Sequence, residues 1–271
     1  MSQQRIRLTL LGTGSSGGVP RVGGDWGASG PTEPKTRRVR CAALVGTWDA
    51  QTPEAKTTVL IDTSPDMREQ LLTAEVPRLD AILFTHDHAD QTHGIDDVRA
   101  LVIRNRKQIK AYMDAATHST LFPKFRYAFE GDGGYPPIID LQPRMTAFTP
   151  LSVEGPGGAL KALPIDQEHG RIRSLGFRFG DIAYCNDLNA FPERAFDELQ
   201  GLDVLVIDAL RYTPHPSHAH LERTLEWIDQ LQPGRAVLTN LHVDLDYQTL
   251  IKELPDGVEP AFDGWSCEVT A

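Results

Sequence analysis

The sequence has few cysteines, and their number and spacing exclude a disulfide-stapled architecture. The 271 residues contain three of them, Cys41, Cys185 and Cys267. An odd number of distant cysteines is typical of reduced thiols in a reducing compartment rather than of a disulfide framework. None forms a metal-binding pair with another by local spacing. We therefore expect neither a disulfide scaffold nor a site built on a local cysteine pair.

Long apolar segments are also missing. No stretch approaches the roughly 18 consecutive apolar residues that a membrane-spanning helix needs. The opening residues 1–14 lead directly into a strand-like pattern and lack the apolar core and cleavage site of a signal peptide. We expect a cytoplasmic protein with no membrane segment.

Basic residues are fewer than acidic ones. Lysines and arginines number 27 and aspartates and glutamates 37, which gives a formal net charge of -10. Nonspecific binding to long nucleic acids draws most of its affinity from basic side chains that neutralise phosphates. The balance therefore argues against a long nucleic acid as partner. A small anionic substrate remains compatible with it, provided that metals or local basic groups supply positive charge.

Short apolar runs alternate with helical patterns along the whole chain. Seven runs end in Gly, Asp, Thr or Asn and predict buried strands. They are Ile6–Leu11, Thr58–Ile61, Ala81–Phe84, Leu160–Ile165, Ile182–Cys185, Val204–Ile207 and Ala236–Leu238. Apolar residues at helical spacing predict helices over Asp97–Lys107 and His220–Leu231. Residues 12–35, rich in Gly, Ser and Pro, are expected to form a long ordered loop. The mixture favours a layered α/β fold, and we expect a single domain spanning residues 1–271.

The strongest chemical signal is a cluster of polar residues directly after the predicted strand Ala81–Phe84. His86, His88 and Asp90 follow one another at every second position and precede a helical pattern. From a tight loop, two imidazoles and a carboxylate at this spacing can converge on one divalent metal ion, for which both are suitable ligands. The pattern therefore indicates a metal site at the end of this strand.

Similar residues recur where later predicted strands end. His169 comes shortly after Leu160–Ile165, Asp187 follows Ile182–Cys185, and His242 follows Ala236–Leu238. One histidine at a strand end is more often structural, but a repeated pattern favours a shared site. We therefore add His169, Asp187 and His242 to the candidate metal ligands.

The order of these motifs resembles the metallo-β-lactamase superfamily over almost the whole chain. Asp62 after a strand, the His86-x-His88-x-Asp90 motif, His169, Asp187 and a late histidine follow the superfamily's order. Four further segments resemble a narrower branch, which contains phosphoribosyl 1,2-cyclic phosphate phosphodiesterase and is related to ribonuclease Z. They are Gly12–Pro20, Arg40-Cys41, Ser217-His218 and Phe262–Gly264.

The resemblance implies an αββα sandwich of two halves, with the site along one edge of the paired sheets. It implies one or two divalent transition metal ions, Mn or Zn. His86, His88 and His169 would hold the first ion, Asp187 would bridge, and Asp90 would bind the second ion and orient or deprotonate the attacking water. Asp62 would either brace a ligand histidine or cap its strand. His218 would protonate the leaving oxygen, or else be a solvated loop histidine.

Two residues differ from the residue pattern of this branch, and both stand where the branch has ligands of the second metal. The family usually has histidine where this chain has Gln91 and where it has Asn240. Because carboxamides are weak ligands compared with imidazole, the second site is expected to be looser, rebuilt around His242, or partly empty. Relatives with a structural zinc carry a cysteine cluster in the early loop, which is absent here, so no structural zinc is predicted.

The leading prediction for function is a metal-dependent phosphodiesterase. It would cleave a small cyclic phosphate or nucleotide-like phosphodiester with a metal-activated water. The alternatives are an RNA-processing nuclease like ribonuclease Z, a hydrolase of thioesters or β-lactams, and a non-catalytic accessory protein with a degraded second metal site. By analogy with relatives, a homodimer is the expected assembly.

Overall fold

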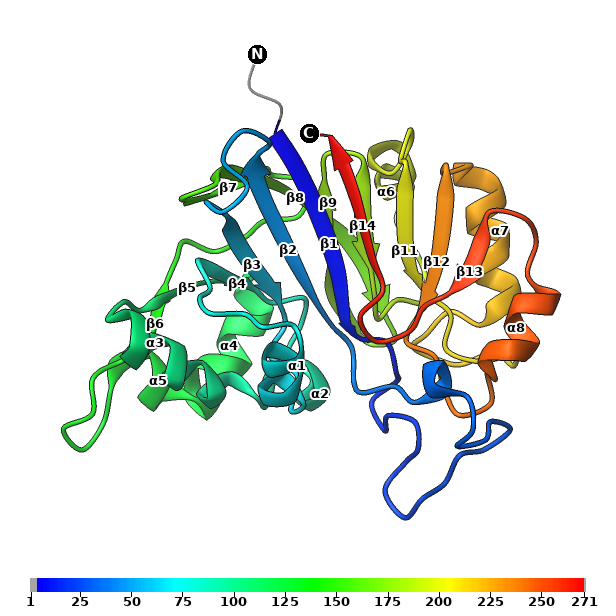
Figure 1. Ribbon diagram of the computed structural model, residues 1–271, viewed down its shortest axis with the longest axis horizontal. Helices are drawn as coiled ribbons and strands as arrows, with labels where there is room; N and C mark the ends of the chain where they lie inside the picture. The colour runs from blue at the N-terminus through cyan, green and yellow to red at the C-terminus, as the bar shows by residue number, and fades with distance from the viewer. Residues whose placement is uncertain (1–3, 271) are drawn as a thin grey trace.

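The computed structural model describes residues 4–270 and has four layers, with two β-sheets face to face and helices on the outer faces (Figure 1). This arrangement confirms the αββα sandwich predicted from the sequence. None of the helices within the described range is long and apolar enough to cross a membrane.

The first sheet has seven strands in the order β14-β1-β2-β3-β4-β5-β6. These strands are β1 (Gln4–Gly12), β2 (Ala42–Asp49), β3 (Thr57–Ile61), β4 (Ala81–Leu83), β5 (Ile109–Tyr112), β6 (Ile139–Leu141) and β14 (Ser266–Thr270). Pairing is antiparallel from β14 to β3 and parallel from β3 to β6.

The second sheet repeats this plan in the order β13-β12-β11-β10-β9-β8-β7. Its strands are β7 (Leu151–Gly155), β8 (Gly158–His169), β9 (Ile172–Phe179), β10 (Ile182–Cys185), β11 (Val204–Asp208), β12 (Arg235–Thr239) and β13 (Val258–Pro260). Pairing is antiparallel from β7 to β10 and parallel from β10 to β13. The chain therefore consists of two halves with the same mixed-sheet arrangement.

Helices cover the outer face of each sheet (Figure 1). Those beside the first sheet are α1 (Met67–Thr73), α2 (Ala89–Thr92), α3 (Arg99–Asn105), α4 (Ala115–Lys124) and α5 (Arg126–Glu130). Those beside the second sheet are α6 (Glu193–Glu198), α7 (Leu221–Leu231) and α8 (Tyr247–Glu253). Two 3-10 helices, η1 (Pro34–Thr36) and η2 (Ile95–Val98), lie in connecting segments.

Strand β3 shows how the sequence builds these layers. Val59 and Ile61 point between the two sheets, where they join a core that includes Phe177. Leu60 points to the other face and packs with Met67 of α1. Because a parallel strand in the middle of a sandwich is covered on both faces, its residues are apolar without alternation. The uninterrupted run at 59–61 in the sequence has this origin.

The parallel strands bring polar residues to one edge of the sandwich. Asp62 follows β3 and His86 lies shortly after β4, while Asp187 comes shortly after β10 and Asn240 follows β12. His169 is the last residue of β8. Since the carboxyl ends of neighbouring parallel strands meet at the same edge, residues far apart in the chain become neighbours there.

The long loop between β1 and β2 is fastened to the fold by Asp263. One carboxylate oxygen of Asp263 accepts hydrogen bonds from the backbone nitrogen and the hydroxyl of Thr13, at 2.9 and 2.8 Å. The other oxygen accepts from the backbone nitrogen of Val39 at 2.7 Å. One side chain from the C-terminal end of the chain therefore ties both ends of the loop.

Replacing Asp263 with alanine is expected to lower the free energy of unfolding by about 1 to 3 kcal/mol, because it leaves buried donors at Thr13 and Val39 without an acceptor. Urea unfolding monitored by circular dichroism measures the loss. Asp256→Ala, at an exposed position, is the control and should change stability by less than about 0.5 kcal/mol. Equal stability of the two variants would contradict this role of Asp263.

Candidate metal centre

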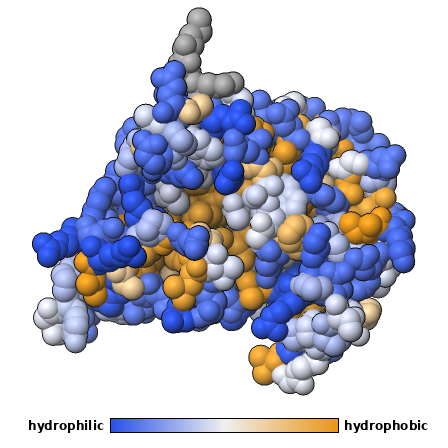
Figure 2. Space-filling model, in the orientation of Figure 1, coloured by the Kyte–Doolittle hydropathy of each residue, from blue (hydrophilic) through white to orange (hydrophobic). Residues whose placement is uncertain are grey.

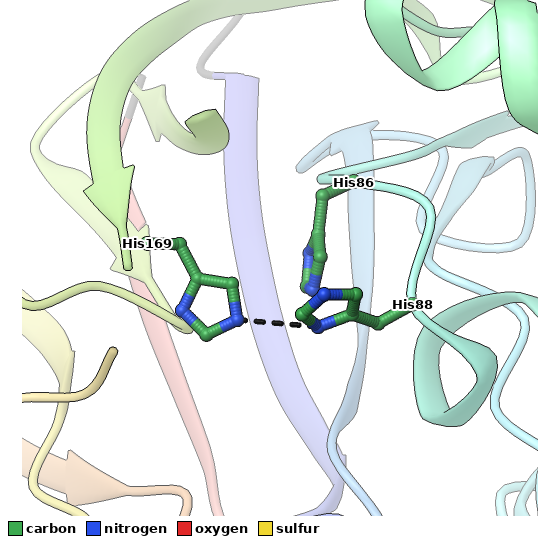
Figure 3. A group of neighbouring side chains, drawn as sticks. All are labelled: His86, His88 and His169. Carbon is green, nitrogen blue, oxygen red and sulfur yellow. Dashed lines mark hydrogen bonds between the residues drawn. The ribbon is translucent and has the colours of Figure 1, made fainter. Parts of the chain in front are cut away.

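Three imidazoles from both halves of the sandwich face one another. His86 and His88 lie in the loop after β4, and His169 ends β8 (Figure 3). The ring centroids are 4.5 Å apart for His86 and His88, 5.0 Å for His86 and His169, and 4.9 Å for His88 and His169. Nδ1 of His88 lies 3.2 Å from Nε2 of His169. These three side chains form a group with the composition and closeness needed to hold one metal ion.

A chain of hydrogen bonds orients His86. Asp62 accepts from the backbone nitrogen and the hydroxyl of Thr85, both at 2.8 Å. Because the Thr85 hydroxyl donates to Asp62, it accepts the proton of His86 Nδ1, which is 2.9 Å away. The other ring nitrogen, Nε2, is then left with its lone pair, and it is buried with no hydrogen-bond partner in the described residues. An unpartnered imidazole nitrogen at this place fits a metal ligand.

Asp62 itself is fully buried. Burial raises the pKa of its carboxyl to about 8, although the hydrogen bonds from Thr85 act in the opposite direction. The sequence left open whether Asp62 braces a histidine or caps its strand. In the structure its side chain contacts the backbone and hydroxyl of Thr85, and through that hydroxyl it acts on His86.

His169 is held in the ligand-competent form by the loop before α7. Its Nδ1 donates to the carbonyl oxygen of Ser217 at 2.6 Å, which leaves Nε2 free to face the centre. Burial lowers the pKa of His169 to about 3, so the ring is neutral at physiological pH. Gly170 makes the close approach to this loop feasible, since a Cβ there would lie 2.8 Å from Cβ of Ser217, and its φ of +62° also favours glycine.

Asp187 lies beside this group and is surrounded by carboxamides. Its Oδ2 accepts hydrogen bonds from Gln91 at 2.9 Å and Asn186 at 2.7 Å, and its Oδ1 accepts from Asn240 at 3.1 Å. Burial raises the pKa of the Asp187 carboxyl well above its usual value, while the nearby His218 lowers it. Together with His169 and His218, Asp187 forms a second group of candidate ligands.

His218 is paired with a buried carboxylate. Its Nδ1 donates to Oδ2 of Asp208 at 2.8 Å and lies 3.6 Å from Oδ1 of Asp187. Burial of the ring opposes its charge, but the two carboxylates outweigh that effect and raise the pKa of His218 to about 9. The ring centroid of His218 is 4.7 Å from that of His169. A protonated imidazole therefore borders the histidine group at neutral pH.

Not all predicted residues join these groups. The structure places His242 apart from them, where its Nε2 contacts the guanidinium of Arg21 and its Nδ1 lies 3.0 Å from the carboxylate of Asp244. Among the described residues, His242 is in neither of the two groups of candidate ligands. Asp90 lies half-buried in the first turn of α2, close enough to raise the pKa of Asp187 and of His218.

A hollow of about 640 Å³ is lined by residues that neighbour the histidines in the chain. They include Asp87, which lies between His86 and His88, and Gly170 and Arg171, which follow His169. Thr117 of α4 also lines it. A volume of this size is typical of pockets that bind small molecules.

Sequence reasoning missed three features of the site. Asp208 was not among the predicted site residues, yet its carboxylate accepts a hydrogen bond from His218. Gln91 and Asn240 attracted attention as poor metal ligands, not as hydrogen-bond donors to Asp187. The available signal was position, since Asp208 and Asn240 both stand where parallel neighbouring strands end.

Comparisons with known proteins agree with this geometry. A family model described as "Beta-lactamase superfamily domain" matches residues 57–240. A protein of Porphyromonas gingivalis (strain ATCC BAA-308 / W83) named octanoyltransferase is 31% identical over 268 residues, which are 96% of this chain and 51% of that protein. The chain thus spans about half the length of the curated relative it matches.

Solved structures are similar over nearly the full chain. A structure described as a new diphosphatase from the PhnP family has a TM-score of 0.86 and 33% identity, and the match covers 98% of both chains. Zn²⁺-bound PqqB from Methylobacterium extorquens has a TM-score of 0.71 at 15% identity, covering 97% of this chain and 100% of that one. Human tRNase Z, short form, has a TM-score of 0.62 at 17% identity, covering 96% and 98%. The last two similarities show the fold alone.

Proposed function

We propose that this protein, which belongs to the metallo-β-lactamase superfamily and within it to the PhnP family, is a metal-dependent phosphodiesterase. Its substrate would be a small anionic molecule. One observation carries the proposal: three imidazoles converge, and the buried Nε2 of His86 has no other partner in the described residues. The donor set of neutral imidazoles with a nearby carboxylate suits Zn or Mn.

His86, His88 and His169 would hold the ion, with Asp187 as the carboxylate ligand. When bound, a divalent ion lowers the pKa of a coordinated water from about 16 toward about 7 and polarises a phosphoryl oxygen. Asp90 would orient the attacking water from the first turn of α2. His218, protonated and fixed by Asp208, would donate its proton to the leaving oxygen. The hollow lined by Asp87, Gly170 and Thr117 would receive the rest of the substrate.

A phosphodiester and a diphosphate both present a phosphorus atom with a bridging oxygen that must leave. The match to a structure described as a diphosphatase, at 33% identity over nearly the whole chain, favours a diphosphate bond as the second candidate. Octanoyl transfer is not part of the proposal, because the P. gingivalis protein is about twice as long as the matched segment. The net charge of -10 argues against long RNA as substrate.

We further propose that the protein is cytoplasmic and that it forms a homodimer. Neither feature is needed for the proposed chemistry, since every residue with a proposed role comes from one chain. Size-exclusion chromatography with light scattering would give the assembly state directly.

The proposed function is tested by metal content and turnover together. Protein purified without chelator is expected to contain bound Zn or Mn by elemental analysis. It should hydrolyse bis(p-nitrophenyl) phosphate or a nucleoside diphosphate, and dialysis against a chelator should abolish turnover until metal is returned. The preferred substrate distinguishes the two candidates. Absence of bound metal, with no turnover after reconstitution, would instead support a non-catalytic accessory protein.

A further inference from the structure

The carboxylate of Asp187 has almost no free acceptor capacity. Each carboxylate oxygen offers about two lone pairs. Oδ2 accepts from both Gln91 and Asn186, so its capacity is filled. Oδ1 accepts from Asn240 and keeps one lone pair. A carboxylate in this state can contribute one oxygen to one metal ion, but it cannot bridge two ions without losing a carboxamide.

From this arrangement we infer that the centre holds one metal ion per chain, and that Gln91 and Asn240 are positioning residues that replace a second ion. The inference rests on the proposed metal centre but not on the identity of the substrate. It concerns the carboxamides around Asp187, which we call the amide clamp: Gln91, Asn186 and Asn240.

The orientation of each amide in the clamp is determined by its neighbours. If the Gln91 amide were turned over, its oxygen would face Oδ2 of Asp187 at about 3 Å, which is repulsive. The Asn240 amide nitrogen lies 3.1 Å from Oδ1 of Asp187 and 3.1 Å from Nδ1 of His218, and its oxygen lies 4.0 Å from Sγ of Cys41. Both amides therefore present NH₂ groups to Asp187.

The fold holds the clamp rigidly. Gln91 is fully buried, and its backbone oxygen accepts from the nitrogen of Thr63 at 2.8 Å. Asn186 is equally buried, and its backbone oxygen accepts from the side chain of Gln167 at 2.9 Å. Asn240 follows β12 with a φ of 62°, a left-handed conformation that asparagine tolerates better than most residues. The donors come from three separate elements and converge on one carboxylate.

Few donors remain for a second ion among the described residues. Asp90 is available, whereas both ring nitrogens of His242 contact other side chains, those of Arg21 and Asp244. The amide oxygen of Gln91 is buried without a partner, but a single neutral oxygen is a weak ligand. The group of His169, Asp187 and His218 shares His169 with the three-histidine group. An ion held by the three histidines would therefore leave a second ion with one further imidazole of these two groups, that of His218.

The amide clamp supplies locally part of what a second cation would supply. Its NH₂ groups stabilise the Asp187 carboxylate through three hydrogen bonds, as the charge of a cation would. The hydrogen bonds of the clamp therefore take the place of a second ion beside Asp187.

Metal titration of the whole protein tests this inference. Chelator-treated protein is titrated with Mn²⁺ or Zn²⁺ alone by isothermal calorimetry, and retained metal is measured after gel filtration. Wild type is expected to bind one ion per chain, and Mn²⁺ should give the electron paramagnetic resonance signal of an isolated ion. The double variant Gln91→His/Asn240→His is expected to bind two ions per chain and to show spin coupling between them.

A single variant addresses the positioning role. Asn240→Leu should weaken metal binding about 10- to 100-fold, because it removes a donor that orients a ligand carboxylate. Asn105→Leu is the matched control. The exposed Asn105 donates to the backbone oxygen of Pro77 and to that of Leu101 on α3. Its replacement should leave metal affinity unchanged. Circular dichroism checks that each variant folds.

The outcomes separate this inference from the proposed function. Two ions per wild-type chain, or equal metal affinity of Asn240→Leu and wild type, would overturn the inference even if phosphodiesters are hydrolysed. One ion per wild-type chain without phosphate turnover would leave it standing and remove the proposed function. If the double variant does not fold, the wild-type stoichiometry decides alone.

Discussion

His88→Ala is expected to release the metal and to lower phosphodiester turnover on the order of 10³-fold or more, because the water would lose the ion that brings its pKa from about 16 toward about 7. His88 is an informative choice among the three histidines. It is exposed, whereas His86 and His169 are buried, so its removal opens no cavity in the core. Elemental analysis and turnover of bis(p-nitrophenyl) phosphate measure the two effects on one preparation.

His93→Ala is the matched control for this substitution. His93 is also exposed and is the C-cap of α2, the short helix whose N-cap is His88. Its ring, however, packs on Phe125, with the ring centroids 5.6 Å apart. Metal content and turnover should stay at the wild-type level in this variant. Full metal content in His88→Ala would show that the three imidazoles do not act as a ligand set.

His218→Ala is expected to lower turnover by about 10²- to 10⁴-fold, the range for loss of a general acid. Metal content should change little, since the three-histidine group does not include His218. A substrate with a nitrophenolate leaving group needs less protonation than one with an alkyl alcohol. The defect should therefore be smaller for the nitrophenyl ester, and a comparison of the two leaving groups measures it. Equal defects for both would argue against proton donation by His218.

The pH profile gives a second readout for the same residue. The acid form of His218 is lost as pH rises through its pKa, which Asp208 and Asp187 raise to about 9 against the effect of burial. Turnover should therefore fall on the alkaline side. Asp208→Asn removes one of these negative charges, so the pKa should drop and the alkaline limb should shift to lower pH. If turnover of this variant falls over the same alkaline pH range as that of wild type, a group other than His218 is responsible for the fall.

The fold could be predicted in its main features because its central strands are buried on both faces. Residues 59–61 and 204–207 are apolar without interruption and lie within β3 and β11. The first helix predicted, Asp97–Lys107, is divided in the structure into η2 and α3. The second begins at Leu221 rather than His220, which is its N-cap.

Strand β9 illustrates what the sequence pattern did not reveal. Its residues 172–179 mix charged and apolar side chains around Gly176, where a Cβ would lie 3.0 Å from Sγ of Cys185. Glycine weakens a strand pattern locally, and here it is needed for close contact with the neighbouring strand. The reason for this strand lies in its pairing with β8 and β10, the strands directly before and after it in the chain, and not in its own residue pattern.

The sequence by itself determined which residues come together at one edge of the sandwich. His86, His88, His169 and Asp187 all stand at or just beyond strand ends, and a strand end can be recognised from a few adjacent residues. The carboxyl ends of parallel strands meet at one edge, so local patterns were enough to place these residues near one another.

Only the tertiary structure decided which atoms contact which. The bond from His218 to Asp208, the clamp on Asp187 and the separation of His242 depend on the distance and direction between segments far apart in the chain. A hydrogen bond needs its donor and acceptor within about 3 Å and in suitable orientation, and spacing along the chain does not specify either. For that reason the sequence indicated carboxamides at the expected second metal position, while the packing of the two halves showed that they donate hydrogen bonds to Asp187.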